Sequence, residues 1–166
     1  ENEKILILGV GQTGKTTMIK ALSSFDETYI GQIFYKVKNL KKYSDNEKRF
    51  SVLFSEPVLL NSTINKNIDY LCEVEGIEKF SQEKKKELLD KFLINKQLDE
   101  KINKLTLCEK RKLAMLRAWI KKPEVLFLDD QFVGLDENEV DDIKLLYKLF
   151  FNEKLVVIAV AENKTI

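Results

Sequence analysis

The chain has 166 residues, 44% of them hydrophobic and 33% charged, a composition typical of one globular domain with a sizeable core. Its 28 basic and 27 acidic residues nearly cancel, so no overall positive field attracts nucleic acid, and no nucleic-acid partner is expected. No apolar run approaches the roughly 18 residues that a membrane-spanning helix needs, and histidine is absent, which excludes chemistry that depends on an imidazole.

The first chemical motif is a phosphate-binding loop. Residues 5–8 predict a strand, residues 15–24 predict a helix, and between them GVGQTGKT (9–16) fits the P-loop pattern G-x-x-x-x-G-K-[ST]. Glycines let several backbone N–H groups point at one anion, and the helix adds the positive end of its dipole. Lys15 then supplies charge to the β- and γ-phosphates, and the Thr16 hydroxyl can ligate Mg²⁺. A glycine-rich turn that binds nothing is the alternative. The residues predicted to contact nucleotide are Gly9, Gly11, Gln12, Thr13, Gly14, Lys15, Thr16 and Thr17.

Strands and helices alternate along the rest of the chain. Further strands are predicted at residues 33–37, 51–54, 125–129 and 155–161, and further helices at residues 82–93, 109–120 and 137–151. This alternation predicts an α/β fold with a largely parallel sheet flanked by helices. Residues 57–104 are helix-rich and polar without a convincing strand, which predicts a helical insertion. The basic runs at 84–86 and 110–112 are interpreted as solvated helix faces.

A second half of a nucleotide site is predicted at residues 125–130, VLFLDD. This is the Walker B arrangement, in which an apolar strand ends in a carboxylate beside the P-loop and helps to hold Mg²⁺. Asp129 is the predicted metal-binding acid, together with Thr16, and Asp130 is placed to orient the attacking water. A buried strand that merely ends in acidic turn residues is the alternative.

Other motifs follow in a fixed order. GQIFY (31–35) is similar to the "SGEI" strand opening, and FSEPVLLNSTI (54–64) is similar to a Q-loop segment. Residues 117–118 (RA), 134–136 (GLD, the D-loop) and 160–162 (VAE) also keep their register. The LSGGQ signature aligns with Leu105, Thr106, Leu107, Cys108 and Glu109. With the P-loop and Walker B motif, this order resembles the nucleotide-binding domain of ATP-binding cassette (ABC) proteins along nearly the whole chain.

The resemblance implies a P-loop NTPase core with an ABC-type helical subdomain at approximately residues 57–122, all within one domain over residues 1–166. It further implies ATP and Mg²⁺ as ligands, a second nucleotide-binding domain as partner in a homo- or heterodimer, and membrane permease subunits. The expected location is cytoplasmic, peripheral on the inner face of a membrane. An upstream aromatic loop and a C-terminal end that the family possesses are expected to be missing from this chain.

Several positions depart from the family pattern. Ser55 stands where the family has the Q-loop glutamine, and its side chain is too short to reach the metal. Leu107 and Cys108 stand where the family has the two signature glycines, and their side chains are expected to crowd a facing phosphate. Asp130 stands where the family has the catalytic glutamate. Glu162 stands where the family has the switch histidine, and its anion would repel the γ-phosphate. The resemblance therefore assigns catalytic positions to Asp130, Glu162 and Ser55, and predicts MgATP binding with weakened hydrolysis.

Two other classes of protein remain open. One is a hydrolysis-impaired regulatory module that uses nucleotide as a ligand, because the departures concentrate on the hydrolytic side of the site. The other is a GTPase, because residues 95–98 (NKQL) are similar to the guanine-reading N-K-x-D. Leu98, however, stands where that motif needs a carboxylate.

Overall fold

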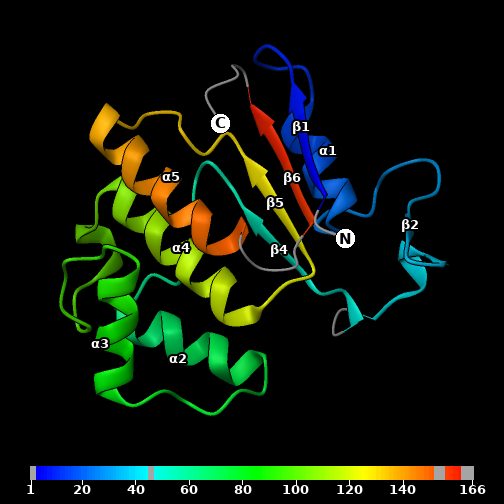
Figure 1. Ribbon diagram of the computed structural model, residues 1–166. Coiled ribbons are helices and arrows are strands. Elements are labelled where there is room, and N and C mark those ends of the chain that lie inside the picture. Colours follow the sequence, from blue (N-terminus) through cyan, green and yellow to red (C-terminus); the bar gives the residue numbers. More distant parts are fainter. Residues whose placement is uncertain (1–2, 45–46, 152–155, 162–166) are drawn as a thin grey trace.

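A computed structural model describes residues 3–44, 47–151 and 156–161 (Figure 1). Among these residues no helix combines the length and the apolar character needed to cross a bilayer. In chain order the elements are β1 (Lys4–Leu8), α1 (Lys15–Leu22), β2 (Phe34–Tyr35), β3 (Lys38–Asn39), the 3-10 helix η1 (Leu40–Lys42), β4 (Phe50–Leu53), α2 (Ile64–Val74), α3 (Gln82–Lys91), the 3-10 helix η3 (Ile102–Lys104), α4 (Leu107–Lys121), β5 (Val125–Asp129), α5 (Glu137–Phe151) and β6 (Val156–Ala161).

The centre of the fold is a parallel sheet with the strand order β1-β6-β5-β4. Helix α1 covers one face, and α4 and α5 cover the other (Figure 1). Strand β5 is buried on both faces, since Phe127 packs in the cluster on the α1 side and Leu126 and Leu128 pack in the cluster with α4 and α5. The predicted α/β fold with a parallel sheet flanked by helices is confirmed.

The strand predicted at residues 33–37 does not join this sheet. Only Phe34–Tyr35 is extended, and it pairs antiparallel with Lys38–Asn39 in a separate two-stranded ladder. Lys36 turns the chain between them, with a φ of 53°. The prediction was wrong because the apolar alternation is not buried here: Phe34 is 64% exposed, and Tyr35 packs edge-on against Phe50.

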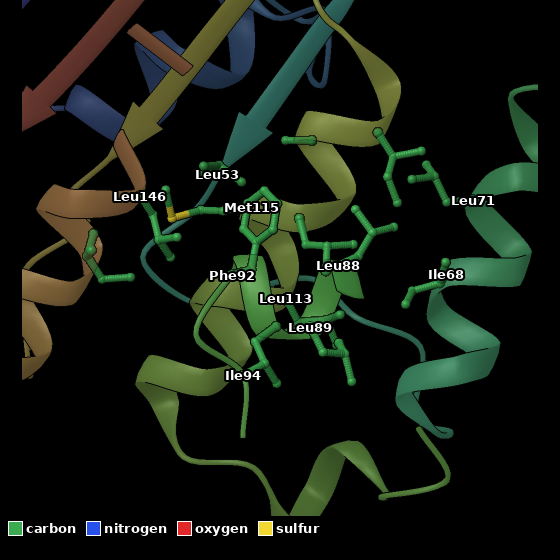
Figure 2. Close-up of a cluster of buried hydrophobic side chains, with 14 of the residues drawn as sticks. Leu53, Ile68, Leu71, Leu88, Leu89, Phe92, Ile94, Leu113, Met115 and Leu146 are labelled. Carbon is green, nitrogen blue, oxygen red and sulfur yellow. The ribbon is translucent and has the colours of Figure 1, made fainter. Parts of the chain in front are cut away.

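A second group of helices lies to one side of the sheet (Figure 1). Helices α2 and α3 pack on α4, which also contacts β4 and α5. Figure 2 shows the side chains of one cluster that extends to Leu53 at the end of β4. Its labelled members include Ile68 of α2, Leu88 of α3, Phe92 directly after α3, and Leu113 of α4. Helix α4 therefore connects the packing of α2 and α3 to the strand ends that carry the candidate site.

The two basic runs are not wholly solvated, so their interpretation as solvated helix faces was wrong. Lys85, Arg111 and Lys112 are only 2%, 2% and 6% exposed. The ammonium of Lys85 pairs with Asp69 of α2 at 2.5 Å, and that of Lys112 pairs with Asp142 of α5 at 2.6 Å. The two buried lysines are tolerated because a carboxylate from a neighbouring helix meets each of them, whereas Arg111 donates to main-chain carbonyls.

Candidate functional site

The loop between β1 and α1 is a tight turn that requires glycine. Gly14, directly before the helix, has a φ of 86°, and Gln12 also lies in the left-handed region with a φ of 62°. A Cβ on Gly9 would lie 2.9 Å from Oγ1 of Thr13, which itself donates to the carbonyl of Val10 at 2.8 Å. The Thr13–Val10 hydrogen bond thus closes the loop on itself.

Lys15 lies over this loop. It is 8% exposed, and its ammonium donates to the carbonyl oxygens of Gly9 at 2.7 Å and Val10 at 3.0 Å. These neutral acceptors are weaker partners than a phosphate oxygen would be, because charge-assisted hydrogen bonds are roughly twice as strong as neutral ones. Lys15 borders a hollow of about 300 Å³, which is lined by Gly11, Gln12, Gly14, Lys15, Thr16, Thr17 and Asp130.

Thr16 and Asp129 form the contact that joins the loop to β5. The Thr16 hydroxyl donates toward both carboxylate oxygens of Asp129, at 2.8 and 3.0 Å, and Asp129 is 1% exposed. Burial raises the pKa of Asp129, although the Thr16 hydrogen bond opposes this rise. A hydroxyl and a carboxylate beside a phosphate-sized hollow are the hard oxygen donors that Mg²⁺ prefers. The residues present therefore fit Mg²⁺, with Thr16 and Asp129 as the groups that would hold it.

The raised pKa of Asp129 gives a prediction for stability without metal. An acid with a raised pKa in the folded state adds stability below its unfolded pKa, about 3.9, and this contribution is lost as pH rises through the folded pKa. Asp129→Asn, which stays neutral, should therefore melt at a higher temperature than the wild type near pH 7, and the difference should shrink toward about pH 4. Thermal melts in EDTA between about pH 4 and pH 7 measure this difference in melting temperature. Curves of melting temperature against pH that run parallel for the two proteins would contradict the prediction.

Asp130 and Ser55 lie at the same edge of the sheet. Asp130 has a φ of 42°, uncommon for a residue with a side chain, and its N–H donates to the carbonyl of Val160 at 3.1 Å. It borders the hollow of Lys15. Ser55 borders an adjoining hollow of about 260 Å³ together with Thr16 and Asp129. The structure thus brings together these predicted site residues, whereas Glu162 lies outside the described residues.

The residues aligned with the signature form the start of α4. Thr106 caps the helix: its hydroxyl accepts from the N–H of Glu109 at 3.2 Å, and the Glu109 carboxylate accepts from the N–H of Thr106 at 2.9 Å. Leu105 is 5% and Cys108 3% exposed, and burial raises the pKa of the Cys108 thiol to about 11. In the described part of the chain, none of the residues 105–109 lines either hollow beside Thr16.

Leu107 is half-buried, and it lies against the D-loop of its own chain. Its Cδ2 is 3.4 Å from the place where a Cβ of Gly134 would be, and Gly134 has a φ of 77°. Gly134 has no side chain, so the facing loop leaves room for the Leu107 side chain, which stands at a position aligned with a signature glycine. The expected crowding of a facing phosphate by Leu107 and Cys108 stays a prediction, with the Cys108 side chain turned into the core.

Two buried residues beside the site were missed by the sequence reasoning. Arg111 of α4 donates to the carbonyl oxygens of Ser55 and Gln131, and the Gln131 side chain donates to the carbonyls of Leu53 and Asp129. The available signal was helical spacing, because Arg111 follows the buried Cys108 by three residues and precedes the buried Met115 by four.

A larger cavity, of about 880 Å³, lies elsewhere. It is bordered by Lys48 and Arg49 before β4 and by the last residues of α2 and α4, and no motif residue lines it. The donor groups of Lys15, Thr16 and Asp129 lie instead at the two smaller hollows.

Comparisons with known proteins agree with this geometry. A family model described as "ABC transporter" matches residues 1–133. The spermidine/putrescine import ATP-binding protein PotA of Borrelia garinii is 30% identical over 138 residues, which are 82% of this chain and 40% of the relative. The methionine import ATP-binding protein MetN of Staphylococcus haemolyticus is 29% identical over 165 residues, 95% of this chain and 48% of the relative. The chain thus spans less than half the length of these two relatives.

Solved structures share the fold. A structure described as the ATP binding subunit of an ABC transporter has a TM-score of 0.78 at 20% identity, covering 96% of this chain and 68% of the other. The structure of cbiO1 from Clostridium perfringens, part of the complex cbiONQ, has a TM-score of 0.72 at 21% identity, covering 97% and 67%.

Proposed function

The chain belongs to the ABC transporter family, whose model matches residues 1–133, and we propose that it is the MgATP-binding part of an ABC transporter. In this role it couples nucleotide binding, or slow hydrolysis, to transport through membrane subunits. The observation that carries the proposal is the Thr16–Asp129 contact, which lies directly beside the hollow of Lys15. Bound Mg²⁺ would neutralise phosphate charge at this point. Calorimetric titration with ATP, in Mg²⁺ and in EDTA, tests it.

A second nucleotide-binding domain completes the proposed site. The support is the position of the signature-aligned residues at the start of α4, outside the two hollows that border Thr16 in the described chain. In a homodimer both composite sites carry Leu107 and Cys108. In a heterodimer an intact partner signature could face this P-loop. Analytical ultracentrifugation with and without MgATP distinguishes a dimer from a monomer, and co-purification identifies a different partner.

A hydrolysis-impaired regulatory module is the second candidate function. Ser55 and Asp130 border the proposed metal site in place of the longer glutamine and glutamate, which favours binding over turnover. A steady-state ATPase assay beside the binding titration separates the two functions. A GTPase gains no support from the structure, because Leu98, at the position of the guanine-reading carboxylate, is buried in the cluster of α2, α3 and α4.

The membrane partner is proposed to contact the segment around Leu60. Of the apolar residues near the start of the helical region, Ile64, Ile68 and Leu71 are buried, whereas Leu60 and Tyr70 are 37% and 47% exposed. The backbone of Leu60 is fixed, because its N–H and its carbonyl both bond to the side chain of the fully buried Asn67, at 2.9 and 3.1 Å. The Leu60 side chain can therefore be changed without releasing the segment.

Leu60→Glu is expected to reduce co-purification of the membrane subunits by at least about tenfold, because a charge is placed in an apolar contact. The melting temperature and MgATP affinity should stay at the wild-type values. Val74→Glu, at the other end of α2 where Val74 is 59% exposed, is the matched control and should retain the partner. Full partner binding by a folded Leu60→Glu variant would remove this surface from the proposal.

A further inference from the structure

We propose that Arg111 is a positioning residue that couples the Ser55 segment to the acidic end of β5. This inference rests on the proposed function, since the acids at that end are the ones proposed to hold Mg²⁺. Arg111 touches neither hollow of the site. It acts on main-chain atoms behind the site, where the loops that follow β4 and β5 approach each other.

The guanidinium of Arg111 makes three hydrogen bonds to two loops. Nε and Nη2 donate to the carbonyl oxygen of Ser55 at 3.1 and 2.8 Å, and Nη1 donates to the carbonyl oxygen of Gln131 at 2.8 Å. The guanidinium is planar and its donors have a fixed spacing, so holding one carbonyl sets the position of the other. A lysine, whose charge is a single point on a flexible stem, cannot hold both in this way.

Gln131 completes the link. Its Nε2 donates to the carbonyl oxygens of Leu53, at 2.8 Å, and Asp129, at 2.9 Å. The pairing of β4 with β5 ends at Leu53 and Leu128, one residue before the metal-binding acid. Arg111 and Gln131 therefore continue the connection between the two strands past the end of their ladder, directly behind Asp129.

The burial of the Arg111 side chain supports a role for these three hydrogen bonds. It is 2% exposed on a helix face whose neighbours Cys108 and Met115 are apolar and buried, so an apolar residue would fit the helix pattern. A buried charge is costly unless hydrogen bonds satisfy it. Here the bonds go to two main-chain carbonyls in the loops that follow β4 and β5 rather than to a carboxylate of the core.

The consequence is a mechanical path from the Ser55 segment to Asp130. Ser55 has too short a side chain to reach a metal held by Thr16, the contact that a glutamine at this position would supply in the family. Its carbonyl instead moves with the guanidinium, which moves the carbonyl of Gln131, the residue next to Asp130. Displacement of the Ser55 segment by a partner would in this way reach the catalytic acid.

Hydrogen exchange tests the link without nucleotide. Arg111→Met should speed amide exchange at least about tenfold in peptides covering both 53–58 and 129–134. Arg117→Met is the matched control: Arg117 lies on the same helix and donates to the carbonyl of Val58 at 3.1 Å, so only the first segment should respond. Arg111→Lys, which keeps the charge and supports folding, should still speed exchange at 129–134. Wild-type exchange at 129–134 in both Arg111 variants would overturn the proposal.

The metal dependence of ATP binding tests the consequence. Arg111→Met should lower the ratio of ATP affinity in Mg²⁺ to that in EDTA by at least about fivefold, while affinity in EDTA stays within about twofold of wild type. A purely structural role would lower both affinities together. An unchanged ratio in Arg111→Met, with wild type binding MgATP, would overturn the inference. If wild type binds ATP in neither condition, the proposed function fails, and the exchange experiment still decides whether Arg111 links the two loops.

Discussion

Lys15→Ala is expected to lower the affinity for MgATP at least about tenfold, or about 1.4 kcal/mol. Lys15 is 8% exposed, and its ammonium is held at the loop by the carbonyl oxygens of Gly9 and Val10, which are weaker acceptors than a phosphate oxygen. Its removal deletes a buried charge-assisted contact and leaves the loop glycines in place. Isothermal titration calorimetry measures the change.

The control for this prediction is Lys66→Ala. Lys66 is an exposed lysine of α2, and its loss alters the net charge by the same amount. The affinity of the Lys66→Ala variant for MgATP should equal that of the wild type. Equal affinities for wild type and Lys15→Ala would show that the loop does not bind the phosphates of ATP.

The double variant Asp130→Glu with Glu162→His should hydrolyse ATP at least about tenfold faster than the wild type, whose isolated chain should turn over slowly or not at all. An oriented base and a stabilising donor each typically change rates by about 10²–10³-fold, and the proposed roles of Asp130 and Glu162 place these two groups at the altered positions. Asp130 borders the hollow of Lys15, and the added methylene of a glutamate would give its carboxylate a longer reach there. Glu162 follows β6, and its anion would repel the γ-phosphate.

Single substitutions should recover little, because each leaves the other defect in place. Phosphate release under saturating MgATP measures turnover, and Lys15→Ala in the double-variant background controls for contaminating ATPases. Robust hydrolysis by the unmodified chain would show that Asp130 and Glu162 do not have the proposed roles. It would also exclude the hydrolysis-impaired module as the function.

Short sequence motifs and their succession along the chain were sufficient to predict the family and the core of the fold. A strand, a glycine-rich loop ending in Lys15-Thr16 and a helix are short-range patterns, and so is the apolar strand ending in Asp129. Parallel strands place their carboxyl ends at one sheet edge, so the meeting of these two motifs could be expected before any contact was known. The Thr16–Asp129 contact, between residues 113 positions apart, agrees with that expectation.

Which polar groups are buried, and which atoms they bind, depends on how the helices and loops pack together. The sequence marks Arg111 as one member of a basic run, and nothing in its neighbours tells that the guanidinium ends on the carbonyls of Ser55 and Gln131. Every residue carries a carbonyl, so side-chain identity does not reveal a main-chain acceptor. The strand expected at residues 33–37 failed for a related reason: Tyr35 gains its burial from Phe50, and the chain reverses at Lys36 before a longer strand can form. The acceptors of Arg111 and the length of the strand at residues 34–35 both depend on which surfaces pack together. Local periodicity in the sequence does not predict those contacts.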